Sequence, residues 1–201
     1  IRILGVTNPG QTPVLLGTSP SQFFVRDFYL FGTLIVAAGS ATNSTPAMAV
    51  FNASNPASIS VQGQLNLGAS FGPTASAICG NSANAWVAAP ISGGAGKSLR
   101  VISLSNLSAP QQTAQVADIG EVQLRAMQLS PDGHSIYVGC EQAWKVFDVN
   151  NGGLPSLVSS NPIAIRALGF DFSGTTAYVA IWRSVLAYDV SNPVQPQLLR
   201  S

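Results

Sequence analysis

Three of the seven arginines in this sequence stand at the same point of a repeated phrase: Arg26 in "VRD", Arg125 in "LRA" and Arg166 in "IRA". The second repeat has Ser76 there. A guanidinium offers a planar fork of N–H donors that suits a carboxylate or a phosphate. If the three side chains face one opening, they could bind an anionic ligand or an acidic side chain of a partner. The sequence favours a structural alternative, in which each arginine bonds backbone carbonyls or an Asp of the neighbouring repeat.

Residue types with catalytic chemistry are otherwise scarce. The single histidine, His134, lies in the turn "SPDGHS". One His without a Cys neighbour cannot make the usual zinc site, and a Ser-His-Asp triad would need this exposed turn residue. "SGGAGKS" at 92–98 departs from the P-loop spacing, because Ile91 stands where the first Gly belongs. The sequence therefore predicts no catalytic residue, no metal site and no cofactor.

Two carboxylates end apolar strands at equivalent points of the repeat. Asp148 follows "KVF" and Asp189 follows "LAY", each just before an Asn-containing turn. We expect both to accept backbone hydrogen bonds and so cap the turn. Calcium binding by "DVNNGG" is the alternative, but one carboxylate among amides is fewer oxygen ligands than such sites use.

The tryptophans and cysteines have structural interpretations. We expect Trp86, Trp144 and Trp182 to pack between repeats, with a sugar-stacking platform as the alternative. Cys79 and Cys140 are expected to be small buried thiols, although two cysteines could also form one disulfide.

One phrase recurs along the whole chain and positions these residues. It is an alternating apolar run, a turn containing Asn, often followed by Pro, and a second apolar run. The turn residues are Asn8, Asn55, Asn106, Asn151 and Asn192, spaced 47, 51, 45 and 41 residues apart. Runs such as "LAYDV" alternate with period two and predict strands, and Pro cannot continue a sheet ladder. No segment sustains helical periodicity, which excludes a helical solenoid.

A second repeated stretch lies between these phrases. Residues 124–140 and 165–181 each contain a strand, a tight Gly-containing turn and a second strand, and 25–39 and 75–90 are weaker copies. Each repeat then has four short strands. Four-stranded antiparallel units with a period of ~45 residues are typical of propeller blades. The sequence therefore predicts an all-β fold, a β-propeller of four-stranded antiparallel blades.

The last repeats resemble two families of propeller repeat. "SPDGHSIYVGCEQAWKVFDVNNG" resembles the YVTN-type repeat of archaeal and bacterial surface proteins, and "VLAYDVSNPVQPQLLRS" resembles the LVIVD repeat. The first repeats match more loosely, because Asn52 or Ser103 replaces the Asp of the motif. The resemblance implies a propeller, often on an extracellular protein, and no particular activity.

The repeats divide the chain into four blades and part of a fifth. Five outer phrases but only four hairpins are present, so we expect an outer half-blade at 1–18 and blades at 19–66, 67–116, 117–160 and 161–201. Propellers usually have ~4–8 blades. We therefore expect a partial ring of about four and a half blades, part of a larger propeller of the seven-bladed type. Further blades of the same chain, or protein partners, would complete it.

The composition indicates where the protein is located and which partners it lacks. Charged residues make up 8% of the 201 residues, against about 25% in an average soluble protein, and the formal net charge is +1. A polar but uncharged surface favours a secreted or cell-surface protein or an assembled subunit. We expect an extracellular or cell-surface location, with the signal segment absent from this sequence. The lack of a basic tract argues against nucleic acid as a partner. The most apolar stretch, 28–39, is about half the ~20 residues of a membrane-spanning helix.

Three functional hypotheses follow. The first is a non-catalytic, secreted or cell-surface propeller that acts as a scaffold through protein–protein contacts. The second is a propeller that binds an anionic ligand or substrate at the channel mouth through Arg26, Arg125 and Arg166, as part of an enzyme. The third is a carbohydrate-binding propeller.

Overall fold

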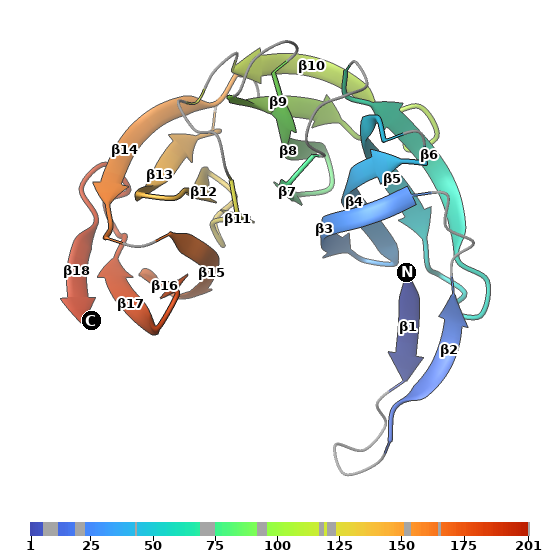
Figure 1. Ribbon diagram of the computed structural model, residues 1–201, viewed down its shortest axis with the longest axis horizontal. Helices are drawn as coiled ribbons and strands as arrows, with labels where there is room; N and C mark the ends of the chain where they lie inside the picture. Colours follow the sequence, from blue (N-terminus) through green and yellow to red (C-terminus); the bar gives the residue numbers. More distant parts are fainter. Residues whose placement is uncertain are drawn as a thin grey trace.

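The chain folds into antiparallel sheets arranged as an arc, shown by the computed structural model in Figure 1. The structure describes residues 1–5, 12–18, 23–42, 44–68, 75–91, 96–116, 119, 124–150, 154–164 and 166–200. Within them lie one two-stranded and four four-stranded sheets. The prediction of an all-β, partial β-propeller is confirmed.

The strands follow one another in the same order in every blade. The half-blade contains β1 (Arg2–Gly5) and β2 (Val14–Thr18), and blade 1 contains β3 (Phe23–Phe31), β4 (Leu34–Ala41), β5 (Pro46–Asn52) and β6 (Ser60–Asn66). Blade 2 contains β7 (Ala77–Gly80), β8 (Asn84–Pro90), β9 (Lys97–Ser103) and β10 (Gln111–Val116). Blade 3 contains β11 (Ala126–Leu129), β12 (Ser135–Gly139), β13 (Ala143–Asp148) and β14 (Ser156–Pro162). Blade 4 contains β15 (Ala167–Ser173), β16 (Thr176–Ile181), β17 (Ser184–Asp189) and β18 (Gln197–Arg200).

The blades stand side by side around the inner edge of the arc. Their first strands, β3, β7, β11 and β15, lie next to one another there, and the fourth strands form the outer edge. Figure 1 shows the arc open between blade 4 and the half-blade. Within the residues that the structure describes, no helix is long and apolar enough to cross a bilayer.

The core consists of layers between neighbouring blades. The middle strands, such as β4 and β8, are buried on both faces because each is sandwiched between two other blades. Alanines, among them Ala37, Ala49 and Ala88, allow these sheets to approach closely. Side chains buried on both faces explain why the middle strands do not alternate between apolar and polar residues.

Two tryptophans pack between blades as expected, and one does not. Trp86 lies in the apolar cluster between blades 2 and 3, and Trp144 lies between blades 3 and 4. Trp182 is 63% exposed, so that part of the prediction was wrong. It lies in the turn between β16 and β17, on the last blade of the arc, where no further blade covers it. Cys79 and Cys140 are buried thiols, as predicted.

The turns before the fourth strands are held by the capping bonds that the sequence predicted. Asp148 Oδ1 accepts a bond from the Asn150 amide at 2.8 Å, and Asp189 Oδ1 accepts one from the Ser191 amide at 2.9 Å. Hydrogen bonds from the backbone amide and the side chain of Ser191 lower the pKa of Asp189. Asn52 makes the same bond to the Ser54 amide in blade 1. An amide oxygen therefore replaces the carboxylate of the motif without loss of the turn.

All five outer strands, β2, β6, β10, β14 and β18, carry a β-bulge at the same register position. In β2, β6 and β14 the residue after the bulge faces the Asn turn of the next blade. A Cβ on Gly17 would lie 1.7 Å from the Pro56 carbonyl oxygen, and a Cβ on Gly63 would lie 2.1 Å from the Leu107 carbonyl oxygen. Ser159 Oγ instead donates to the Pro193 carbonyl at 2.9 Å. β2 therefore packs against blade 1 in the same way as β6 and β14 pack against the blade that follows each of them.

Candidate functional site

Two of the three repeated arginines converge on one carboxylate. Glu141 lies in the turn between β12 and β13, and its Oε1 is 3.7 Å from Nη2 of Arg125 and 3.5 Å from Nη2 of Arg166. The three side chains are 38–40% exposed. Arg125 belongs to blade 3 and Arg166 leads into blade 4, so Glu141 ties the two blades together at this face.

The pairing shows that the two guanidinium groups can hold a carboxylate between them. Both separations exceed the usual distance of a charge-assisted hydrogen bond, and solvent screens the charges. From the sequence we expected an Asp or a backbone carbonyl as the partner of each arginine, and we did not predict Glu141. The signal available was its position, directly after the hairpin repeat of residues 124–140 that begins with Leu124 and Arg125.

Arg26 lies apart from this cluster. It is the bulged residue of β3, between Val25 and Asp27, and blade 2 separates it from Arg125. Arg125 and Arg166 instead precede β11 and β15. The structure therefore brings together two of the three arginines, and the third lines a different site.

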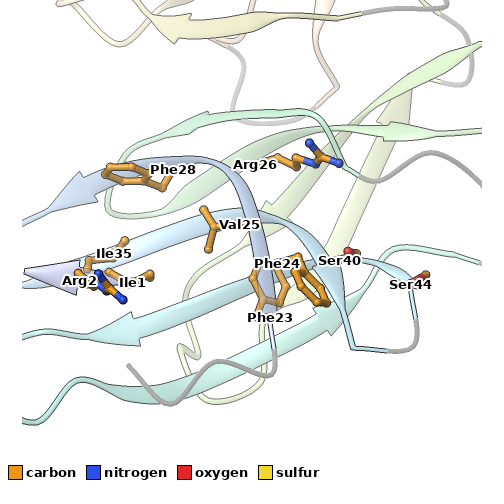
Figure 2. A pocket seen from close by; sticks show the side chains of 10 residues that line it. All are labelled: Ile1, Arg2, Phe23, Phe24, Val25, Arg26, Phe28, Ile35, Ser40 and Ser44. Carbon is orange, nitrogen blue, oxygen red and sulfur yellow. The ribbon is translucent and has the colours of Figure 1, made fainter. Parts of the chain in front are cut away.

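That site is a cavity of about 740 Å³ at the open N-terminal end of the arc. Figure 2 shows its lining side chains: Ile1, Arg2, Phe23, Phe24, Val25, Arg26, Phe28, Ile35, Ser40 and Ser44. A second cavity, of about 460 Å³, continues along Leu4, Phe28 and Leu30. Phe24, Phe28 and Leu30, all on β3, are 64%, 54% and 66% exposed. Large apolar side chains at these exposures form a face that another element would cover.

A partly buried carboxylate joins blades 1 and 2 near this cavity. Asp27 Oδ2 accepts a bond from the Ile78 amide at 2.9 Å, and Oδ1 accepts one from the Phe28 amide at 2.9 Å. Burial raises the pKa of Asp27, and the two hydrogen bonds oppose that effect. Tyr29 donates to the Asn81 carbonyl at 3.3 Å. These bonds fix β3, and with it the cavity wall, against blade 2.

The remaining sequence candidates have structural roles. Asp132 Oδ1 accepts from the His134 amide at 3.0 Å, which is an Asx turn within the hairpin. Lys97 and Ser98, the last residues of "SGGAGKS", begin β9 rather than a helix, and residues 92–95 lie outside the described part. Asn151 also lies outside it. In the described ranges, no three His, Cys, Asp or Glu side chains gather as metal ligands would.

Sequence reasoning missed a buried arginine in blade 2. Arg100 is 8% exposed, and its Nη2 donates to the Pro90 carbonyl at 3.0 Å while Nε donates to Ser98 Oγ at 3.2 Å. Burial lowers its pKa. Nothing in "SLRVIS" distinguishes this residue from an exposed arginine, because two of its partners, Pro90 and Gln112, come from the neighbouring strands β8 and β10.

Comparison with known proteins gives the fold. No protein-family model matches the sequence, and no curated protein matches it significantly. Solved β-propellers are similar in structure. A Lactobacillus plantarum protein has a TM-score of 0.73 at 18% identity, covering 99% of this chain and 63% of its own. A Bacteroides uniformis protein named as a candidate 6-phosphogluconolactonase has a TM-score of 0.72 at 16% identity, covering 94% of this chain and 59% of its own.

A third similar structure has nearly the size of this chain. The computationally designed Ika4 protein has a TM-score of 0.61 at 12% identity, covering 90% of this chain and 98% of its own. At these identities the likeness shows the fold alone. The chain spans about 60% of the length of the two natural proteins.

Proposed function

We propose that this chain acts as a non-catalytic β-propeller module that works through protein–protein contacts on a secreted or cell-surface protein. The observation that carries this proposal is where the exposed apolar side chains gather. One group is Phe24, Phe28 and Leu30 at one end of the arc. The other is on blade 4, where Trp182 is 63% and Val185 is 56% exposed.

Two further features support the proposal. Only 8% of the residues are charged, which suits a surface that is covered in an assembly. The final repeat also resembles the LVIVD repeat in "LAYDVSNP", which belongs to propellers often found on extracellular proteins. The proposal therefore includes an extracellular or cell-surface location and a ring completed by protein partners or further blades.

The native mass of the chain tests this proposal. We expect light scattering after size exclusion to give a particle larger than the 20.8 kDa of one copy. Val185→Glu on blade 4 should reduce that mass, because it places a charge on the apolar face. Val61→Glu is the matched control, since Val61 is 49% exposed on β6 within the arc. A stable particle of one copy that binds no apolar dye would contradict the proposal.

The Arg125–Glu141–Arg166 cluster supports a second candidate, the binding of an acidic partner or anion. Glu141 already places a carboxylate between two guanidinium groups, so an incoming acid of similar size fits the same donors. We expect Glu141→Gln to strengthen the binding of inorganic phosphate, measured by calorimetry, and Arg125→Gln with Arg166→Gln to abolish it. A loss of Tm in the double variant, without phosphate binding in either protein, would assign the cluster a structural role.

A further inference from the structure

The half-blade has the form of two strands of a four-stranded blade. Ile3 pairs with Gly17 after the bulge of β2, and Val146 pairs with Ser159 after the bulge of β14. β1 is therefore the counterpart of β13, a third strand, and β2 is the counterpart of β14. Each complete blade has a hairpin paired to the inner edge of its third strand.

The inner edge of β1 has no such hairpin. Among the described residues β1 pairs with β2 alone, so its other edge offers backbone donors and acceptors to an added strand. The two cavities, of about 740 and 460 Å³, both contact Ile1 and Arg2, next to this edge. Phe24, Phe28 and Leu30 face the same space from β3. An unpaired edge and an apolar wall are the two surfaces that an inner hairpin contacts in the other blades.

The charges on the cavity narrow the choice of occupant. Of its described lining residues, Arg2 and Arg26 are basic and none is acidic, and both arginines are exposed. Within the described ranges neither has an ion-pair partner. Between blades 3 and 4 the comparable space holds Glu141, on the turn that joins the inner hairpin to the third strand. An occupant that carries a carboxylate there would complement this cavity.

We infer that the cavity is the seat of a β-hairpin of the same protein, which pairs with the free edge of β1 and carries a carboxylate facing Arg26. The hairpin has the form of the chain's own inner hairpins, two short strands joined by a tight turn. The similar natural propellers support the choice of the same protein, because this chain spans only 63% and 59% of their lengths. The inference rests on the proposed function and names the partner at one of the two apolar ends.

A hairpin grafted onto the N-terminus tests whether this cavity accepts one. A copy of residues 124–143 placed directly before Ile1 has the register of blade 3, because Ile1 corresponds to Trp144. We expect the amides of β1 to exchange at least tenfold more slowly in the grafted protein and its Tm to rise by about 5 °C. The control is the same graft with Met127→Pro and Val138→Pro in the copy only, which cannot pair with β1. Equal exchange and equal Tm in the two grafts would overturn the inference.

Two further measurements isolate the charge and the source of the hairpin. In the graft, Glu141→Gln in the copy and Arg26→Gln should each lower Tm, and the double variant should lower it no further. Additive losses would overturn the pairing with Arg26. In the ungrafted protein, exchange at β1 that slows with protein concentration would mean that a second copy fills the seat, and the assignment to the same protein would fail. The Val185→Glu test of the proposed function measures native mass, whereas the graft measures exchange and Tm. Failure of the hairpin inference can therefore be distinguished from failure of the proposed function.

Discussion

The outer strand of blade 1 approaches the backbone of blade 2 closely at Gly63, so a single added methyl group should weaken the contact between these blades. In Gly63→Ala the added Cβ would stand 2.1 Å from the Leu107 carbonyl oxygen and 3.0 Å from Pro110 Cδ. Leu107 lies in a turn whose Asn106 Oδ1 accepts a bond from the Ser108 amide at 3.1 Å, so the carbonyl cannot move alone. Overpacking of this kind costs about 1–3 kcal/mol, and we expect ~3 kcal/mol because the obstacle is backbone. For a chain of this size that lowers Tm by about 6–12 °C.

Gly169→Ala is the matched control for this prediction. Gly169 also lies in a strand, β15, but a Cβ there would meet only Ala180 Cβ at 3.9 Å, an ordinary contact. Replacing Gly with Ala where the backbone permits it stabilises by about 0.4–1 kcal/mol, through the unfolded state. Urea unfolding of both variants measures the difference. If Gly63→Ala and Gly169→Ala unfold within about 0.5 kcal/mol of each other, the contact between outer strand and turn does not hold the blades together.

Three other predictions concern residues that lie between blades. Trp144→Ala empties a fully buried site between blades 3 and 4 and should cost about 3–5 kcal/mol in urea unfolding. Burial raises the folded-state pKa of Asp27 above its ordinary value of 3.8, so the native state binds this proton more tightly than the unfolded state does. As pH rises from about 4 through the folded pKa, wild-type stability should therefore fall relative to Asp27→Asn, and the opposite trend would refute that linkage. Cys79 and Cys140 are buried, and burial raises the pKa of Cys79. Both thiols should resist alkylation in the native protein at pH 8 and react after unfolding in urea.

The sequence predicts those parts of this fold that depend on local chemistry. The Asn turns and their caps follow from side chains that bond amides two residues further on, as Asp189 does with Ser191. A period near 45 residues then implies repeated four-stranded units. These features need no knowledge of what lies across the next blade, so a single chain reveals them.

Contacts between blades were not predictable in the same way. Gly63 is one small residue in a polar strand until the Leu107 carbonyl of the next blade is placed against it. Glu141 lies 25 residues before Arg166, and only the stacking of blades 3 and 4 brings the two together. The shared phrase around the arginines also did not reveal that β3 bulges at Arg26 and turns that residue toward a different opening.

The two ends of the arc differ in what they lack. At the N-terminal end, among the residues that the structure describes, β1 pairs with β2 alone, so the exposed apolar side chains line cavities next to an unpaired strand edge. At the other end blade 4 has all four strands, and its apolar side chains form an open face instead. After the bulge of β18 stands Arg200, where the other outer strands have Gly17, Gly63, Ala114 or Ser159. A long guanidinium at that point can donate to a turn carbonyl at greater reach than Ser159 Oγ, but it leaves no room for the close backbone contact of the glycines. A blade that packed on blade 4 through the same kind of turn would therefore meet Arg200 where blades 1 and 2 meet at Gly63.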